Sequence, residues 1–247
     1  MAKKLLIANW KMNPLTEKEA RELFEAEAAG LKKLKSVESV ICPPFPFIPL
    51  FGQSRTIWLG GQDLFWELQG AYTGEVSGKM LKHFNCRYVI VGHSERREYF
   101  GESDEIINLK IKTAIKSGLK PIFCVGEQVG QEMGSVLDQQ LKNGLAGISK
   151  NQIKEIVIAY EPVWAIGTGN ACSADNAMSA TLFIRKVLTV LYSRFLADNT
   201  MILYGGSVDS KNAADYIKES KMNGLLVGGA SLDAGEFIKI GESIDNL

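Results

Sequence analysis

The decisive stretch of the sequence is residues 156–169, IVIAYEPVWAIGTG. Its first five residues, Ile156–Tyr160, are apolar and show no alternation of polar and apolar positions. Such a run is typical of a strand that is buried on both faces, as the strands of parallel sheets are. Glu161 follows immediately, and the glycine-rich turn Gly167-Thr168-Gly169 comes a few residues later. The stretch therefore predicts a parallel strand that ends in a loop bearing a carboxylate.

The same unit recurs along the whole chain. Eight short apolar runs are predicted to be strands, and amphipathic segments separate them: Leu5–Ala8, Ser39–Cys42, Ile57–Gly60, Tyr88–Val91, Pro121–Val125, Ile156–Tyr160, Met201–Tyr204 and Leu225–Val227. This alternation is compatible with an open doubly wound sheet or a closed barrel, and the repeat count and the 247-residue length favour the barrel. No linker interrupts the series. We predict an α/β fold, an eight-stranded parallel β/α barrel, as one domain over residues 1–247.

The intervening segments are predicted to be helices. Thr16 and Glu19 have the spacing of a capping box at the start of Thr16–Gly30, and Gly30 is expected to end that helix. One apolar stripe from Ala177 to Phe195 predicts a single long helix. The further predicted helices are Ser103–Ser117, Glu132–Ala146, Lys211–Glu219 and Glu236–Asp245, with shorter ones at Phe47–Gln53 and Ser77–Phe84.

Composition narrows the possible functions. The chain has 28 basic and 28 acidic residues, so nothing indicates a nucleic-acid-binding surface. No apolar run approaches the roughly 18 residues of a membrane span, and the run near the N-terminus is too short for a signal peptide. Four scattered cysteines without a CxxC pair predict free thiols and a cytoplasmic protein. With only His83 and His93 available, we expect no metal site, and no cofactor is indicated.

Chemistry-bearing residues follow several of the predicted strands. In β/α barrels the carboxyl-terminal ends of the strands form the active site. Asn9 and Lys11 follow the first strand, His93 the fourth and Glu161 the sixth. Two glycine-rich turns follow the seventh and eighth strands, Gly205-Gly206-Ser207 and Gly228-Gly229, where such barrels commonly hold a phosphate.

Each of these residues also has an ordinary structural interpretation. Glu161 can be an exposed loop carboxylate, and Lys11 a solvated surface charge. His93 can be a structural histidine, and the glycine pairs can be tight turns only. Their convergence on one rim instead favours a general base at Glu161, an uncharged imidazole at His93 beside a helix capped by Ser94, and an anion clamp at Lys11.

Six motifs together carry a family resemblance. They are NWKMN (9–13), GHSERR (92–97), CVGE (124–127), AYEPVWAIGTG (159–169), YGGSV (204–208) and VGGASL (227–232). In this order they resemble triose-phosphate isomerase, whose fold is the TIM barrel. The resemblance implies interconversion of dihydroxyacetone phosphate and D-glyceraldehyde 3-phosphate through an enediolate, in glycolysis and gluconeogenesis, without a cofactor.

The resemblance also assigns residues. The catalytic set falls on His93, Glu161, Lys11 and Asn9. Asn9 and Lys11 also bind substrate, together with the phosphate contacts Gly167, Ser207, Gly228 and Gly229. Residues 162–169 would form a lid that excludes water from the enediolate. The lid's exit, Asn170–Ala174, departs from the usual family sequence, although Ser173 can still cap the next helix.

The resemblance further implies a homodimer. The segment Gln62–Val76 is long for a connection and carries Leu64, Phe65, Trp66, Leu68 and Tyr72. These apolar side chains can fold back on their own barrel or bury themselves in a partner subunit. In the family this loop enters the partner beside its active site, and Thr73 matches the residue that reaches it.

Three rival functions remain to be weighed. One is another phosphate-binding barrel enzyme, such as a pentose-phosphate epimerase, usually metal-dependent, or an indole-forming synthase. A second is a nucleotide-binding module, but the GxGxxG-like string that begins at Gly167 fails at Cys172. The third is a non-catalytic barrel, which the intact set of Lys11, His93 and Glu161 disfavours.

Overall fold

All eight predicted runs are strands, and they close into a parallel barrel. The computed structural model describes residues 3–52, 54, 57–165, 172–245 and 247. Strands that follow one another in sequence are neighbours in the barrel, and the last pairs with the first. They are β1 (Lys4–Asn9), β2 (Val37–Cys42), β3 (Trp58–Gly61), β4 (Cys86–Val91), β5 (Lys120–Val125), β6 (Val157–Tyr160), β7 (Met201–Tyr204) and β8 (Gly224–Val227).

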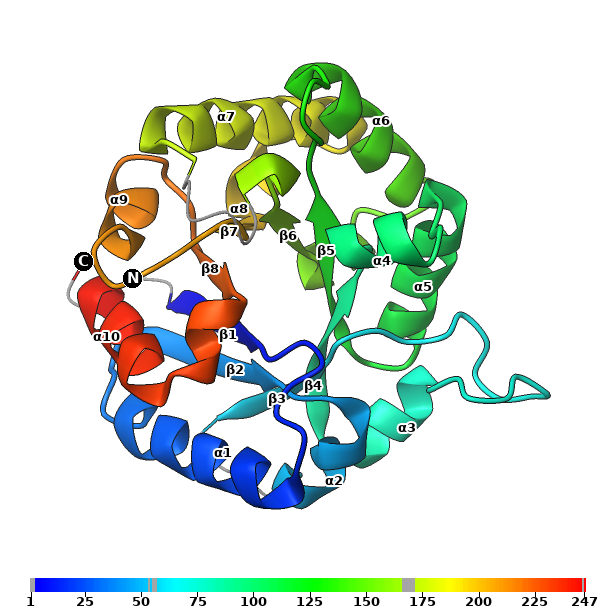
Figure 1. Ribbon diagram of the computed structural model, residues 1–247. Helices are drawn as coiled ribbons and strands as arrows, with labels where there is room; N and C mark the ends of the chain where they lie inside the picture. The colour runs from blue at the N-terminus through cyan, green and yellow to red at the C-terminus, as the bar shows by residue number, and fades with distance from the viewer. Residues whose placement is uncertain (1–2, 53, 55–56, 166–171, 246) are drawn as a thin grey trace.

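Helices form a ring around the strands (Figure 1). They are α1 (Glu17–Leu31), α2 (Ile48–Phe51), α3 (Gly78–His83), α4 (Ser94–Tyr99), α5 (Asp104–Lys116), α6 (Met133–Gly144), α7 (Ala174–Leu191), α8 (Arg194–Asn199), α9 (Ala213–Lys218) and α10 (Ala234–Asp245). Single turns of 3-10 helix complete the chain at η1 (Phe45–Phe47), η2 (Gln152–Glu155), η3 (Val163–Ala165) and η4 (Gly229–Leu232).

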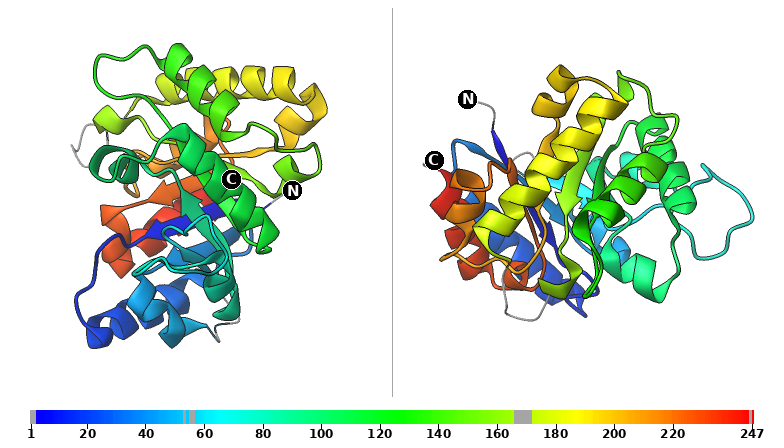
Figure 2. Two further views of the ribbon diagram at one scale, coloured as in Figure 1. Left: turned by 90° about the vertical axis from the view of Figure 1, so that its right-hand side faces the viewer. Right: turned by 90° about the horizontal axis from the view of Figure 1, so that it is seen from above.

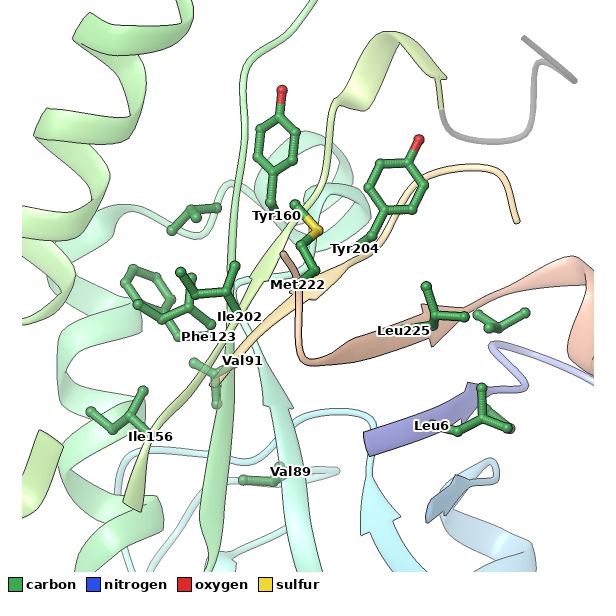
Figure 3. Close-up of a cluster of buried hydrophobic side chains, with 14 of the residues drawn as sticks. Leu6, Val89, Val91, Phe123, Ile156, Tyr160, Ile202, Tyr204, Met222 and Leu225 are labelled. Carbon is green, nitrogen blue, oxygen red and sulfur yellow. The ribbon is translucent and has the colours of Figure 1, made fainter. Parts of the chain in front are cut away.

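The core has an inner and an outer layer. Side chains inside the barrel form one cluster, which includes Ile7, Ile90 and Leu203. The alternate residues of the same strands, such as Leu6, Val91 and Ile202, point outward into a larger cluster beneath the helices (Figure 3). Because both faces of each strand are apolar, the sequence shows continuous runs in place of alternation.

Two predicted helix details are wrong, one because of packing and one because of a local break. Gly30 does not end α1, which continues to Leu31; a Cβ at Gly30 would lie 2.4 Å from Ile238 Cδ1, so glycine is needed where α1 meets α10. The predicted stripe from Ala177 to Phe195 is broken after α7. Ser193 caps a separate helix, α8, and Phe195 is 72% exposed. By contrast, the capping box of Thr16 and Glu19 is present as predicted.

A long loop between β3 and α3, Gln62–Val76, projects from the side of the barrel and is called the arm below (Figures 1 and 2). Its base is anchored, because the buried Lys110 ammonium lies 2.7 Å from Asp63 Oδ1 and the Phe65 N–H donates to the Val76 carbonyl at 2.8 Å. Residues 69–75 at its tip are all exposed. The arm is thus held at its base and exposed at its tip.

Two findings bear on the cellular setting. All four cysteines carry free thiols, and all four are buried. Among the helices of the described residues, none is both long enough and apolar enough to cross a membrane.

Candidate active site

The predicted site residues meet at one cavity at the carboxyl-terminal mouth of the barrel. It has a volume of about 370 Å³. Seven of the eight predicted residues line it: Asn9, Lys11, His93, Glu161, Ser207, Gly228 and Gly229. Gly167, the eighth, lies outside the described residues, as does the second half of the predicted lid, residues 166–169. The parallel strands explain this convergence, because all of them end at the same rim.

Glu161 is the buried carboxylate of the site. Its side chain is 2% exposed, and its Oε2 accepts the Ser94 N–H at 3.0 Å. Its Oε1 lies 3.3 Å from His93 Nε2 but accepts no hydrogen bond from the described part of the chain. A buried carboxylate oxygen without a donor keeps a lone pair available to take a proton.

Two glycines make room for Glu161. A Cβ at Gly126 would lie 1.8 Å from the Glu161 carbonyl oxygen, and one at Gly205 would lie 2.9 Å from Glu161 Cγ. A backbone hydrogen bond fixes Glu161 in this position, because its N–H donates to the Val125 carbonyl at 2.8 Å. Sequence reasoning did not assign Gly126 to the site. The available signal was a glycine directly after the fifth strand.

Replacing Gly126 with alanine is expected to displace the Glu161 backbone. Because even a misplacement of about 1 Å can lower rates by roughly 10²-fold, we expect a kcat loss of that order in Gly126→Ala. Steady-state kinetics measure it, with thermal unfolding to show that the variant is folded. Gly235→Ala is the matched control, because its new methyl group would meet only the carboxylate end of Asp233. A folded Gly126→Ala enzyme with wild-type kcat would contradict the role of this close approach.

His93 presents a defined ring nitrogen to the cavity. Its Nδ1 accepts the backbone N–H of Glu95 at 3.2 Å, which makes His93 itself the N-cap of α4. The prediction that Ser94 caps this helix is therefore wrong; Ser94 is the first helical residue. A ring nitrogen that accepts a hydrogen bond carries no proton, so the ring is uncharged and its N–H is on Nε2, which faces Glu161.

Lys11 is held in an unusual backbone conformation. Its φ is +54°, in the left-handed region that non-glycine residues rarely occupy. The Asn9 side chain accepts the Lys11 N–H at 3.1 Å, and Gln62 Nε2 donates to the Lys11 carbonyl at 2.8 Å. The ammonium group lies 2.5 Å from Glu95 Oε1. Backbone strain that neighbours maintain in this way is typical of functional residues.

The glycine turn after β8 lies beside the Lys11 side chain. A Cβ at Gly228 would lie 3.2 Å from Lys11 Cε, whereas a Cβ at Gly229 would meet no atom within 4 Å. The backbone of this turn, at the start of η4, is thus open to a ligand next to a positive charge. Ser207 also lines the cavity, but its hydroxyl donates to the Ala165 carbonyl at 2.6 Å.

Buried tyrosines support the chain on both sides of residues 166–171. The hydroxyls of Tyr160 and Tyr204 point the same way past the strand ends (Figure 3). Tyr160 and the Trp164 indole both donate to the buried carboxylate of Glu127. The Tyr204 hydroxyl accepts the Cys172 N–H at 3.1 Å. The motif residue Glu127 therefore positions the loop that follows Glu161.

Cys124, the cysteine of the CVGE motif, has a packing role. It belongs to the cluster inside the barrel and is fully buried. Burial raises the pKa of its thiol, and the nearby Glu161 carboxylate raises it further. A thiol held in the neutral form is a weak nucleophile, which fits a packing role.

A carboxylate, an imidazole and an ammonium group at the mouth of a closed β/α barrel define the protein as a β/α-barrel enzyme. The family described as Triosephosphate isomerase matches residues 4–244. The chain belongs to the triosephosphate isomerase family and is an isomerase.

Individual relatives agree over nearly their full length. A triosephosphate isomerase of Dictyoglomus thermophilum is 44% identical over 253 residues, which cover 98% of this chain and 100% of that protein. One of Moorella thermoacetica is 46% identical, covering 97% of this chain and 98% of its own. One of Dehalococcoides mccartyi is also 46% identical, covering 96% and 94%.

Proposed function

We propose that this cavity interconverts dihydroxyacetone phosphate and D-glyceraldehyde 3-phosphate, in glycolysis and gluconeogenesis. The observation that carries the proposal is the meeting of Glu161, His93 and Lys11 at one cavity, next to the open glycine turn at Gly228. A coupled assay with purified protein and either triose phosphate, without added metal or nucleotide, tests it. No turnover under these conditions would overturn it.

Glu161 is the base in this proposal. Its free oxygen takes the proton from the carbon beside the carbonyl group, which leaves an enediolate, and the same carboxylic acid returns a proton to the adjacent carbon. No atom is gained or lost, so the reaction needs no redox partner. The other oxygen, Oε2, accepts the Ser94 N–H and holds the carboxylate in place.

His93 and Lys11 stabilise the negative charge that develops on oxygen. The Nε2–H of His93 donates to the carbonyl oxygen. It gives its proton to that oxygen and takes the hydroxyl proton of the neighbouring oxygen in return, so the ring ends as it began. Lys11 adds a positive charge, and Asn9 fixes its backbone. The substrate phosphate binds at the open turn of Gly228 and Gly229, next to Ser207. Gly167 is the remaining proposed phosphate contact.

Activity is expected to survive exhaustive treatment with EDTA. Two histidines cannot supply a His-rich zinc site, and across the described ranges no three His, Cys, Asp or Glu side chains are grouped as metal ligands would be. Turnover before and after chelation, with buffer-treated enzyme as control, measures this. Loss of activity that added Zn²⁺ or Mg²⁺ restores would favour the epimerase function instead.

We also propose that the enzyme works as a homodimer through the arm. Leu64 at its base packs into the barrel, and Phe65 and Trp66 stack at 4.0 Å and are half-buried. Tyr72 near the tip remains 44% exposed. Part of the apolar content therefore folds back on its own barrel, and the exposed tip is what a partner would cover.

Exposed apolar side chains around the base of the arm favour a dimer interface on this face of the barrel. Met12 is 84% exposed and follows Lys11, whose carbonyl is bonded to the arm residue Gln62. Tyr99 and Phe100 are 71% and 67% exposed at the end of α4. Burying such groups is characteristic of homodimer interfaces. The free, buried thiols further support a cytoplasmic location for the dimer.

A further inference from the structure

The buried face of α1 contains a carboxyl group at a core position. Its four buried residues are Ala20, Phe24, Glu27 and Leu31, at the 4-3-4 spacing of an apolar stripe. Glu27 is 0% exposed, and both of its oxygens are buried without a hydrogen-bond partner among the described residues. A glutamate at such a position is rare unless it is paired or has a function.

Glu27 faces the residue that precedes Lys11. The Trp10 indole lies close enough to lower the pKa of the Glu27 carboxyl group, although the two form no hydrogen bond, and Trp10 is itself fully buried. Trp10 packs edge-on against Phe51 with ring centroids 6.1 Å apart, and Phe51 stacks on Phe24 at 4.1 Å. Helix α1 is thus connected to the turn that bears Lys11 through one buried indole.

No cation among the described residues neutralises Glu27. Within the described part of the chain it takes part in no ion pair, and the charged residues of the neighbouring elements are engaged or exposed. The other charged residues of α1 are exposed, as are Lys239 and Glu242 on α10. Two further carboxylates of α10, Glu236 and Asp245, accept backbone N–H groups. On β1, the Lys4 ammonium donates to the Leu247 carbonyl. Burial therefore raises the pKa of Glu27 to about 9, and the Trp10 N–H opposes this only in part. At neutral pH the group is an uncharged carboxylic acid.

We propose that Glu27 is a positioning residue for Lys11, and that it acts as an uncharged acid beneath Trp10. The left-handed backbone of Lys11 has to be maintained by its surroundings, and Trp10 is joined to it by a peptide bond. A charge on Glu27 would be buried and unpaired, so the region would open to water or shift. Either change moves Trp10 and hence Lys11. This inference rests on the proposed role of Lys11 in binding the substrate.

The kinetic test compares three variants with wild type from about pH 6 to about pH 10. Glu27→Gln keeps polar atoms under Trp10 but cannot ionise, Glu27→Leu removes them, and Glu25→Gln changes an exposed glutamate of the same helix as a control. We expect Glu27→Leu to raise KM about tenfold at every pH, with a smaller effect on kcat. We expect the KM of wild type, but not of Glu27→Gln, to rise as the pH passes about 9. Identical pH profiles for wild type and Glu27→Gln, or an unchanged KM in Glu27→Leu, would overturn the inference.

Two further measurements do not depend on activity. The infrared spectrum at neutral pH should contain the carbonyl stretch of a protonated acid that Glu27→Gln lacks. The free energy of unfolding of wild type, relative to Glu27→Gln, should fall as the pH rises from 4.5 to about 9, because only the folded state retains this proton in that interval. Absence of the infrared band or of the pH slope would show that the buried group is ionised.

The variant Lys11→Met distinguishes failure of the proposed function of Lys11 from failure of the positioning role of Glu27. If that variant keeps wild-type KM and kcat, the proposed function of Lys11 fails. If Lys11→Met loses activity while the Glu27 variants behave like wild type, only the positioning role of Glu27 fails.

Discussion

Replacing Glu161 with glutamine is expected to lower kcat by roughly 10²–10⁴-fold, the usual range for a positioned acid–base group, while KM changes far less. The amide has nearly the shape of the carboxylate but no basic lone pair. It can still accept the Ser94 N–H, and it remains between Gly126 and Gly205. The loss should therefore fall on proton transfer and leave substrate binding largely intact.

Steady-state kinetics in both reaction directions test this prediction. Glu98→Gln, on the exposed side of α4, is the matched control and should behave like wild type. Near-normal kcat in Glu161→Gln would remove Glu161 from the role of base. A large rise in KM with unchanged kcat would instead assign it to substrate binding.

Replacing Thr73 with arginine is expected to give a monomer with greatly reduced activity. Thr73 lies in the exposed tip of the arm, where a partner subunit would bury it. A long charged side chain cannot be buried there without a partner for its charge. Because Gln62 in the arm and the exposed Met12 beside Lys11 belong to the same face, loss of the interface should also loosen Lys11.

Sedimentation at micromolar concentration, together with kinetics on the same sample, measures both effects. Thr189→Arg places the same charge on the exposed face of α7 and should leave assembly and activity unchanged. Wild-type protein that sediments as a monomer of 27.2 kDa while fully active would contradict both the dimer and its coupling to activity.

Much of the fold follows from local pattern. The eight apolar runs are strands within a few residues of their predicted bounds, because a strand buried on both faces needs a continuous apolar segment. The box at Thr16 and Glu19 and the cap at Ser173 also formed as predicted, since a cap involves only residues within one turn. The errors at Gly30 and Phe195 arose where a neighbouring helix or a local break decides the outcome.

The candidate site also contains features that the sequence predicts and features that it does not. The meeting of Asn9, Lys11, His93 and Glu161 at one cavity could be predicted from the sequence, because parallel strands bring the residues that follow them to one rim. That His93 and not Ser94 caps α4 could not be found, because both residues are compatible with the same cap position. The close approach of Gly126 to Glu161 joins residues 35 apart in the chain, and a glycine after the fifth strand does not by itself indicate which residue it approaches.

The sequence by itself determined the order of strands and helices, the rim on which the candidate site lies and the family. These features depend on local periodicity and on short motifs. Only the tertiary structure decided which polar groups are paired and which glycines prevent a steric overlap. It also decided that Glu27 is uncharged, because it buries this residue without a cation. Hydrogen bonding, close packing and desolvation depend on what surrounds a residue in space, and in this barrel those surroundings come from distant parts of the chain.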